Sequence, residues 1–383
     1  MPYNINHLTP VLFGPNMSLR TGMRLKEMGC KRVLFVYDQG IKKAGIPDKI
    51  IANCEALGIK TFLFEDVQAD PPDYTVEACA EIGLKAKVDG VVAIGGGSSM
   101  DTAKVANMLQ TNPPPLSRYL GFGGPPMKPG KKLVLIPTTS GTGSEVTNMA
   151  VITNSQTGNK GGPANNLLRA TLSIIDPVLT VGMPPSITAD TGMDAYCHAA
   201  EAVTSGQANP MSDIIGMEAI KLVCEYLPQA IKDGKNLEAR TKMSFAAMLA
   251  GYAFNDAITH IGHSIGHALG AMYHIPHGNA CGLAIGEIME FVAPSTPDGI
   301  RRVATAMGLS VNGTSTEKVG AMVCDAARKL NKEIGLKTLK DHGLKREQLD
   351  EMAERSLAGP VMFSPRKVTK EDLLGILSKA YDG

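Results

Sequence analysis

The stretch DGVVAIGGGSSMDTAK, residues 89–104, decides the fold class. A short run of apolar, partly β-branched residues is typical of a buried strand, and a helical pattern begins directly after a turn of glycines. Glycines let the backbone approach a phosphate closely, and free N–H groups at a helix start favour its negative charge. The turn departs from GxGxxG because Met100 stands where the third glycine would fall. Taken alone, the motif leaves a glycine-rich turn without a ligand as an alternative.

The sequence on both sides of this turn repeats the same rhythm of strand and helix. Such alternation predicts βαβ units with a mainly parallel sheet. A stretch dense in Pro and Gly, residues 112–131, predicts a loop within this region. Strands are predicted at 32–38, at 60–67 and from 132 onward, and helices at 46–58 and 75–87.

From about residue 180 the pattern changes to long helical periods. In residues 314–330, Thr314 and Glu317 have the spacing of a capping box. The chain's 383 residues exceed the roughly 250–300 at which a single core stops growing. We therefore predict an α/β domain at 1–180 with a mainly parallel sheet and an all-α domain at 181–383. One face of the predicted helix carries Val319, Met322, Val323, Ala326 and Leu330.

Composition narrows the class of partner. With 38 basic and 37 acidic side chains and no run of like charges, the chain has no electrostatic reason to bind nucleic acid or an anionic membrane. The N-terminus lacks a signal-peptide pattern, and no apolar run approaches the roughly 18 residues of a membrane span. The seven cysteines show no CxxC spacing, which favours reduced thiols. We expect a cytoplasmic protein with a small-molecule partner.

Histidine is concentrated in one span. HIGHSIGHALGAMYHIPHG, residues 260–278, holds five of the chain's eight histidines. His263 and His267 are four apart on a predicted helix, so both project from one face. Pro276 ends this region, and His277 begins a new turn. So uneven a distribution favours a metal site over isolated structural histidines.

A second stretch supplies a carboxylate. In DAYCHAAEAV, residues 194–203, Asp194 and His198 have the same spacing of four on another predicted helix. One carboxylate and three imidazoles would make a four-ligand site suited to Zn²⁺ or Fe²⁺, and the absence of cysteine from this set favours iron. His260 and His274 could support the ligands or simply pack.

Two further stretches have residues that could contact a bound nucleotide. Asp38 ends the predicted strand 32–38, where an acidic side chain can accept hydrogen bonds from a ribose 2′-hydroxyl and repel a 2′-phosphate. This favours NAD over NADP, although aspartate is also a common turn residue. PTTSGTGSEVT, residues 137–147, is a second turn rich in small hydroxyl side chains, suited to nucleotide contacts or to an ordinary loop.

The chain resembles the iron-containing, group III alcohol dehydrogenases along nearly its whole length. The resemblance rests on GGGSSMDTAK, PTTSGTGSEVT, GMDAYCHAAEA and HSIGHALGAMYHIPHG, which follow the family's order. It implies an N-terminal dinucleotide-binding domain, a helical metal-binding domain, a cleft that holds metal and nicotinamide, and homodimers or larger homo-oligomers. NAD(H) and Fe²⁺, or Zn²⁺, are the implied cofactors.

The resemblance also implies roles for single residues. Asp194, His198, His263 and His277 match the metal ligands, and His267 matches a histidine near the nicotinamide, suited to a proton relay. Asp70 departs from the asparagine of many relatives and is left out of the site. Asp38 matches the NAD-selecting aspartate. The pyrophosphate loop is matched by Gly95, Gly96, Gly97 and Ser98, with Asp101 bracing it. The nucleotide-facing hydroxyls are matched by Thr138, Thr139, Thr142 and Thr147, and the lining of the cofactor cleft by Val151, Lys160 and Leu179.

The expected reaction is reversible hydride transfer between nicotinamide C4 and the carbonyl carbon of a small aldehyde, with the metal as Lewis acid. Relatives of this type act on lactaldehyde, 1,3-propanediol, butanol and ethanol. The loop 148–169 is polar and could receive an anionic tail, which suggests reduction of sulfoacetaldehyde to isethionate as a hypothesis. A solvated loop is the alternative. The donors in this loop are Asn148, Asn154, Lys160, Asn165, Asn166 and Arg169.

Three alternatives fit less well. Glycerol-dehydrogenase-like and dehydroquinate-synthase-like enzymes differ from this chain in their metal-ligand sets. A metal-binding protein without catalysis leaves Asp38 and the glycine turn unexplained. A serine hydrolase would need a GxSxG elbow, which the sequence lacks.

Overall fold

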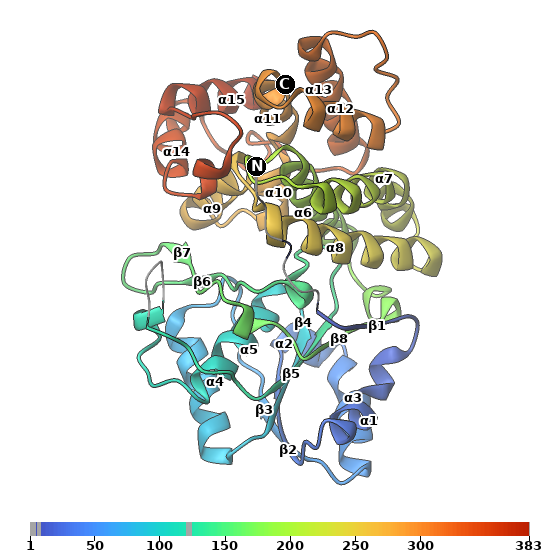
Figure 1. Ribbon diagram of the computed structural model, residues 1–383, viewed down its shortest axis with the longest axis vertical. Coiled ribbons are helices and arrows are strands. Elements are labelled where there is room, and N and C mark those ends of the chain that lie inside the picture. Colours follow the sequence, from blue (N-terminus) through green and yellow to red (C-terminus); the bar gives the residue numbers. More distant parts are fainter. Residues whose placement is uncertain (1–4, 6–8, 120–124, 383) are drawn as a thin grey trace. The chain divides into compact units, whose positions relative to one another are not determined.

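The computed structural model describes Ile5, residues 9–119 and residues 125–382. These residues form two compact units (Figure 1). A sheet unit takes in the described residues up to Thr139, apart from Ile5, together with Ser144–Thr180. A helical unit takes in Ser140–Gly143 and the chain from Val181 onward, with Ile5.

The sheet unit is built on six parallel strands in the order β1-β8-β5-β4-β2-β3. The predicted parallel sheet is therefore confirmed. Its central strands are apolar because both faces of the sheet are covered. The strands are β1 (Val11–Phe13), β2 (Arg32–Val36), β3 (Lys60–Phe64), β4 (Gly90–Gly95), β5 (Lys132–Pro137) and β8 (Leu172–Ile175), and a separate antiparallel pair is formed by β6 (Ile152–Thr153) and β7 (Lys160–Gly161).

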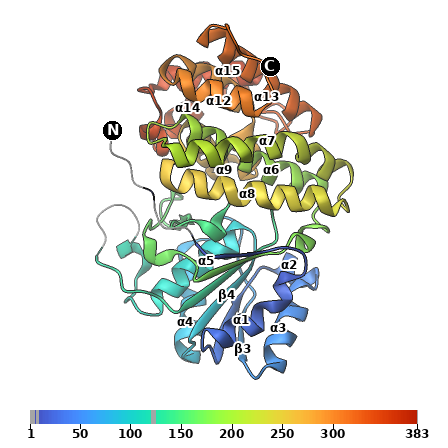
Figure 2. The ribbon, with the colours of Figure 1, turned by 45° about the vertical axis from the view of Figure 1, so that its right-hand side comes forward.

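Helices cover both faces of this sheet (Figure 2). Successive side chains of a strand point to opposite faces, so Leu34 and Val36 of β2 pack into one core with α4 and α5. Val33 and Phe35 pack into the other core with α1 and α3. The expected loop 112–131 contains one 3₁₀ turn, Leu116–Tyr119, and its residues 120–124 lie outside the described part of the chain. The helices are α1 (Thr21–Glu27), α2 (Gln39–Lys43), α3 (Ile46–Ala56), α4 (Asp73–Ala86) and α5 (Gly97–Leu109).

Within its described residues the helical unit contains helices and no strand, as predicted. Helix α6 is buried on nearly every side from Thr188 onward and packs against α7, α8 and α10. The helices are α6 (Pro185–Thr204), α7 (Pro210–Lys232), α8 (Leu237–Ala257), α9 (Ile261–Tyr273), α10 (His277–Gly282), α11 (Ile285–Val292), α12 (Pro297–Ala306), α13 (Thr316–Glu333), α14 (Leu349–Ser356) and α15 (Lys370–Asp382).

The predicted cap of α13 is wrong by one residue. The N-cap is Ser315, whose side chain accepts a hydrogen bond from Lys318 N. The first backbone hydrogen bond of the helix runs from Val319 N to the Ser315 carbonyl, whereas the Thr314 carbonyl accepts from Arg301 Nη2 at 2.6 Å. The buried stripe is close to the predicted one, except that Met322 and Ala326 are only partly buried. Val319, Gly320, Val323, Cys324, Ala327 and Leu330 form it.

Two other expectations can be compared with the described residues. No helix among them is long and apolar enough to cross a membrane. All seven cysteines lie in the described part of the chain, and no two of them form a disulfide.

Candidate metal and nucleotide sites

Three helices of the helical unit bring the predicted metal ligands together. Asp194 and His198 lie one turn apart on α6, His263 lies on α9, and His277 is the first residue of α10. The Oδ1 atom of Asp194 is 3.7 Å from His263 Nε2, 3.7 Å from His277 Nε2 and 3.8 Å from His198 Nδ1. Three imidazoles therefore surround one carboxylate oxygen.

A glycine sets the position of His277. A Cβ on Gly278 would lie 1.8 Å from the carbonyl oxygen of Asp190 on α6, so only glycine lets α10 begin this close to α6. Helix α9 has ended just before, where His274 adopts a left-handed conformation with φ of 54°. His274 is exposed and serves as the C-cap of α9.

The atoms at the centre of the cluster are buried and lack hydrogen-bond partners. Asp194 is 2% exposed, and no hydrogen bond reaches its Oδ1, His198 Nδ1 or His263 Nε2. A buried polar atom without a partner costs about 1–3 kcal/mol, and a cation with oxygen and nitrogen ligands would satisfy all of these atoms. Burial lowers the pKa of His198 well below its usual value, which favours the neutral imidazole that binds metals. The residues present therefore fit a divalent metal.

Glu201, which the sequence analysis did not single out, orients one ligand. It lies on the α6 face that carries Asp194 and His198, at the i, i+4, i+7 spacing that could have revealed it. His263 donates a hydrogen bond from Nδ1 to Glu201 Oε2, so its Nε2 keeps a lone pair toward Asp194. Carboxylates commonly fix metal-binding histidines in this way. Burial alone would raise the pKa of Glu201, but His260 and His263 lower it.

His260 belongs to the same support. Its backbone N–H and that of Gly262 donate to Glu201 Oε1, at 3.1 and 2.6 Å. Its ring is fully buried, with Nδ1 3.2 Å from Glu201 Oε1 and Nε2 3.0 Å from Thr204 Oγ1. His260 is therefore held behind the cluster and does not face Asp194.

The segment Ser140–Gly143 lies against the same helices. A Cβ on Gly141 would be 2.7 Å from the carbonyl oxygen of Thr191 on α6, and one on Gly143 would be 2.5 Å from Gly251 Cα on α8. The backbone of Gly141 also forms a hydrogen bond with His198. The glycines of SGTG are thus required by close packing in the helical unit, where Thr142 also lies.

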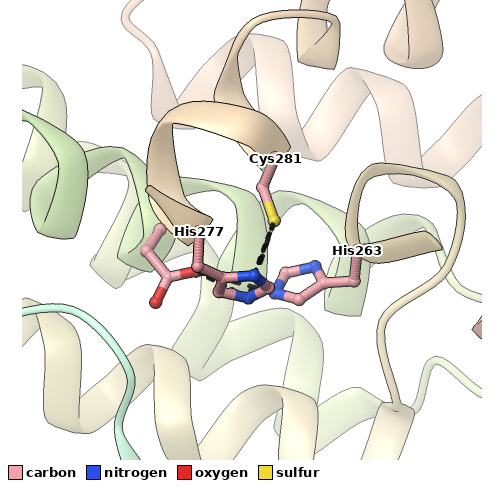
Figure 3. A group of neighbouring side chains, drawn as sticks. His263, His277 and Cys281 are labelled. Carbon is pink, nitrogen blue, oxygen red and sulfur yellow. Dashed lines mark hydrogen bonds and ion pairs between the residues drawn. The ribbon is translucent and has the colours of Figure 1, made fainter. Parts of the chain in front are cut away.

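Two side chains border the cluster. His267 lies one turn after His263 on α9 and is half-buried, and its ring stacks on that of His277 with centroids 5.5 Å apart. Cys281, to which the sequence analysis gave no role, lies one turn after His277 on α10 (Figure 3). Its Sγ lies within 4.8 Å of ligand atoms of Asp194, His263 and His277.

In the sheet unit, the predicted nucleotide-binding elements lie at a topological switch point. Strand β3 lies on one side of β2 and β4 on the other, and ligands of such sheets bind where the strand order reverses, beyond the carboxyl ends of the strands. Asp38 follows β2, and the glycine turn follows β4. A Cβ on Gly95 would be 3.8 Å from Asp38 Oδ2, so the two elements are adjacent. Asp38 also caps α2, because its Oδ1 accepts from Ile41 N.

The turn has the features of an anion site. Gly96 is the N-cap of α5, and Gly97 and Ser98 form its first turn, whose N–H groups have no acceptors within the helix. Gly95 allows no side chain, because a Cβ there would be 2.4 Å from Ser99 Oγ. The hydroxyl oxygens of Ser99 and of Thr138 are buried without a hydrogen-bond partner.

Asp101 and a buried lysine, both on α5, hold the segment 144–151 against this helix. Asp101 accepts from Ser144 Oγ at 2.6 Å and from Val151 N at 2.9 Å. Lys104 Nζ donates to Ser144 Oγ, to Thr147 Oγ1 and to the carbonyl of Met149, at 2.8, 3.0 and 2.8 Å. Burial lowers the pKa of Lys104 to about 8. Thr147, predicted to face the nucleotide, is 1% exposed and hydrogen-bonded to Lys104, so it supports the segment 144–151.

The polar side chains of the loop 148–169 have partners within the sheet unit. Lys160 Nζ pairs with Asp70 Oδ1 at 2.7 Å, and Arg169 Nη1 donates to the Val146 carbonyl at 3.1 Å. Asn148 donates to Asn166, while Asn154 and Asn165 accept backbone hydrogen bonds within the loop. Of the other predicted cofactor residues, Thr139 and Leu179 are half-buried.

Comparison with known proteins identifies the family of this chain. Residues 9–177 match the family model of iron-containing alcohol dehydrogenase, and residues 188–381 match that of the C-terminal part of the Fe-containing alcohol dehydrogenase family. A choline dehydrogenase of Bacillus subtilis (strain 168) is 34% identical over 382 residues, 98% of this chain and 94% of that protein. A 1,3-propanediol dehydrogenase of Citrobacter freundii is 35% identical over 375 residues, 96% of each chain.

Solved structures agree. The crystal structure of sulfoacetaldehyde reductase from Bifidobacterium kashiwanohense in complex with NAD⁺ superposes with a TM-score of 0.91 at 31% identity and covers 100% of this chain and 99% of that chain. The chain therefore belongs to the iron-containing alcohol dehydrogenase family and is an alcohol or aldehyde oxidoreductase.

Proposed function

We propose that this chain interconverts a small primary alcohol and its aldehyde with NAD(H) and a divalent metal, Fe²⁺ or alternatively Zn²⁺. The observation that carries the proposal is the cluster around Asp194, in which three imidazoles surround a buried carboxylate oxygen that has no hydrogen-bond partner. Asp194, His198, His263 and His277 would hold the metal. When bound, the metal supplies a Lewis acid that polarises the oxygen of the reacting carbonyl.

The remaining residues would bind the nucleotide, orient a metal ligand and carry a proton. The first-turn N–H groups of α5 would bind the pyrophosphate, and Asp38 would bind the ribose and exclude a 2′-phosphate. Glu201 keeps the Nε2 of His263 directed at the cluster. His267, half-buried beside His277, is the proposed proton carrier, since the unperturbed pKa of histidine lies near neutral pH.

The substrate is proposed to be small and uncharged. The names of the relatives span a cation (choline), a neutral diol and an anion (sulfoacetaldehyde) at similar identity, so identity does not select among them. The donors of the loop 148–169, which suggested an anionic tail, already have partners: Lys160 pairs with Asp70, and Arg169 binds a carbonyl. This favours lactaldehyde-like or propanediol-derived aldehydes over sulfoacetaldehyde.

An anaerobic assay of Fe²⁺-loaded protein tests the proposal. The oxidation of NADH is followed by absorbance across C2 to C4 aldehydes that include lactaldehyde, 3-hydroxypropanal and sulfoacetaldehyde. We expect metal-dependent turnover, with a higher kcat/KM for an uncharged aldehyde. A higher kcat/KM for sulfoacetaldehyde would contradict the substrate charge, and turnover that is independent of metal would contradict the mechanism.

A further inference from the structure

Helix α10, which begins with the proposed metal ligand His277, is too short to hold its own position. It has six residues, and a helix of this length is stable only when neighbouring segments pack against it. The side chain of His277 is 31% exposed, whereas the other three ligand side chains are 3–6% exposed. The place of its ring therefore depends on what holds the backbone of α10.

Asn279 ties α10 to the turn at residues 338–342. Asn279 is 2% exposed, and its amide nitrogen faces His342, because only this orientation gives both amide atoms a partner. Its Nδ2 donates to His342 Nε2 at 2.8 Å and to the Lys337 carbonyl at 3.2 Å, and its Oδ1 accepts from Lys337 N at 3.1 Å. One buried side chain thus makes three hydrogen bonds to a single segment.

The turn 338–342 is a firm anchor for these bonds. Thr338 N and Oγ1 both donate to Asp341 Oδ2, at 2.9 and 2.8 Å, and Asp341 N donates to Thr338 Oγ1 at 3.2 Å. Leu339 is fully buried in the core of the helical unit. Burial lowers the pKa of His342, so its ring is neutral and Nε2 can accept the hydrogen bond from Asn279.

Two contacts hold the start of α10 from different directions. Gly278 meets α6, where a Cβ would lie 1.8 Å from the Asp190 carbonyl oxygen. The next residue, Asn279, lies about 100° further around the helix, on the side of the turn 338–342. Contact with α6 alone would leave α10 free to rotate about that contact, and the hydrogen bonds of Asn279 prevent this rotation.

We propose that Asn279 is a positioning residue for the metal ligand His277, an inference that rests on the proposed function. By holding α10 to the turn 338–342, Asn279 keeps the ring of His277 directed at Asp194, whose Oδ1 is 3.7 Å from His277 Nε2. Without these hydrogen bonds the ring would become ordered only when the metal binds, and part of the binding free energy would be lost. Asn279 acts through His277 and is not itself a ligand.

Competition with a chelator for Zn²⁺ tests the proposal without relying on activity. We expect Asn279→Ala to weaken Zn²⁺ binding about tenfold, the lower end of the usual cost of losing an outer partner of a ligand. His342→Gln should bind Zn²⁺ as the wild-type protein does, since the glutamine oxygen can accept in place of Nε2, whereas His342→Ala should bind about threefold more weakly. Lower thermal stability with unchanged Zn²⁺ affinity in Asn279→Ala would mean that Asn279 is merely structural.

A double-mutant cycle tests whether Asn279 acts through His277. A site with three protein ligands still binds zinc, so His277→Ala and His263→Ala serve as backgrounds. Asn279→Ala should change Zn²⁺ affinity by no more than about twofold in the His277→Ala background. It should cost about tenfold in the His263→Ala background, whose lost ligand lies on α9. Tenfold losses in both backgrounds would overturn the assignment to His277.

Asn331→Ala is the matched control. Asn331 Nδ2 donates to the Gly282 carbonyl at 2.9 Å, at the opposite end of α10 from His277. This variant should lose stability and keep the Zn²⁺ affinity of the wild-type protein. The same loss of affinity as in Asn279→Ala would overturn the positioning role and leave the metal centre intact. A wild-type protein that binds no stoichiometric Zn²⁺ would overturn the metal centre and this role together.

Discussion

In the sheet unit, the groups that would face an anion are backbone N–H groups of one turn, from Gly96 to Ser98. In the helical unit, the groups that would face a cation are side chains from three helices, spread from Asp194 to His277. The first site needs glycine and a helix start, both of which are local in sequence. The second needs helices packed closely enough for their side chains to meet, which Gly278 makes possible.

Each site also has a buried layer of support. Asp101 and Lys104 hold the segment 144–151 against α5, and Glu201 and His260 hold the ring of His263. Because the two sites use different atoms in different units, a substitution in one should leave binding at the other unchanged. The following predictions test this separation, beginning with the largest expected effect.

Asp194→Ala removes the carboxylate that all three imidazoles surround. We expect loss of stoichiometric metal and a fall in kcat/KM of about 10³-fold or more, since a Lewis acid contributes several kcal/mol to catalysis. NADH affinity, measured by fluorescence titration, should stay unchanged. A variant that keeps its metal would contradict the assigned ligand set.

His267→Ala removes the proposed proton carrier but none of the atoms around Asp194. The expected fall in kcat is about 10²-fold, as is typical for a lost general acid or base. Metal content, measured by mass spectrometry, should remain stoichiometric. Metal loss in this variant would mean that His267 is a ligand.

Glu201→Gln removes the charge that orients His263 through its Nδ1. Metal affinity, measured by competition with a chelator, should fall 10–100-fold, the usual cost of losing such a partner. Glu218→Gln, which changes an exposed acid on α7, is the control and should bind metal as the wild-type protein does. Equal metal affinities in the two variants would show that Glu201 does not support the metal site.

Gly95→Ala brings a methyl group within 2.4 Å of Ser99 Oγ and disturbs the turn. We expect the Kd for NADH to rise about tenfold, roughly 1.4 kcal/mol, while metal content stays constant. Gly58→Ala is a matched control, because Gly58 has a positive φ of 80° but open space around it. Unchanged NADH affinity in Gly95→Ala would contradict the assignment of the turn.

Glu145→Gln tests the buried segment 144–151, in which Glu145 is 3% exposed. Burial raises the pKa of Glu145 from 4.5 to about 7, so the folded protein retains a proton that the unfolded chain loses across this range. The bound proton stabilises the folded protein, and this stabilisation is lost as the pH rises through about 7. We expect the free energy of unfolding of the variant, minus that of wild type, to be about 1–3 kcal/mol larger at pH 8 than at pH 5. Urea unfolding at the two pH values measures it. An equal difference at both pH values would argue against a buried, protonated Glu145.

The sequence predicted the local features well. The parallel sheet, the glycine turn at the start of α5, and the convergence of Asp194, His198, His263 and His277 all follow from spacing within short stretches or from the family motifs. Strand and helix periods report which face of an element is buried, and the i, i+4 spacing places two ligands on one helix face.

Features that depend on packing between distant segments could not be predicted in this way. Glu201 and Cys281 follow a recognised ligand by three or four residues, but only the approach of α9 and α10 to α6 makes them neighbours of His263. The hydrogen bond from Lys104 Nζ to Thr147 Oγ1 likewise joins residues far apart in the sequence. The ion pair of Lys160 with Asp70 joins distant segments in the same way.

Anaerobic titration of metal-free protein with Fe²⁺, in the presence of NADH and the preferred aldehyde, tests the central claim most directly. The account predicts that the rate of NADH oxidation rises linearly and stops rising at one metal per chain, while the Kd for NADH stays constant throughout. Full activity before any metal is added, or a plateau unrelated to one metal per chain, would contradict it.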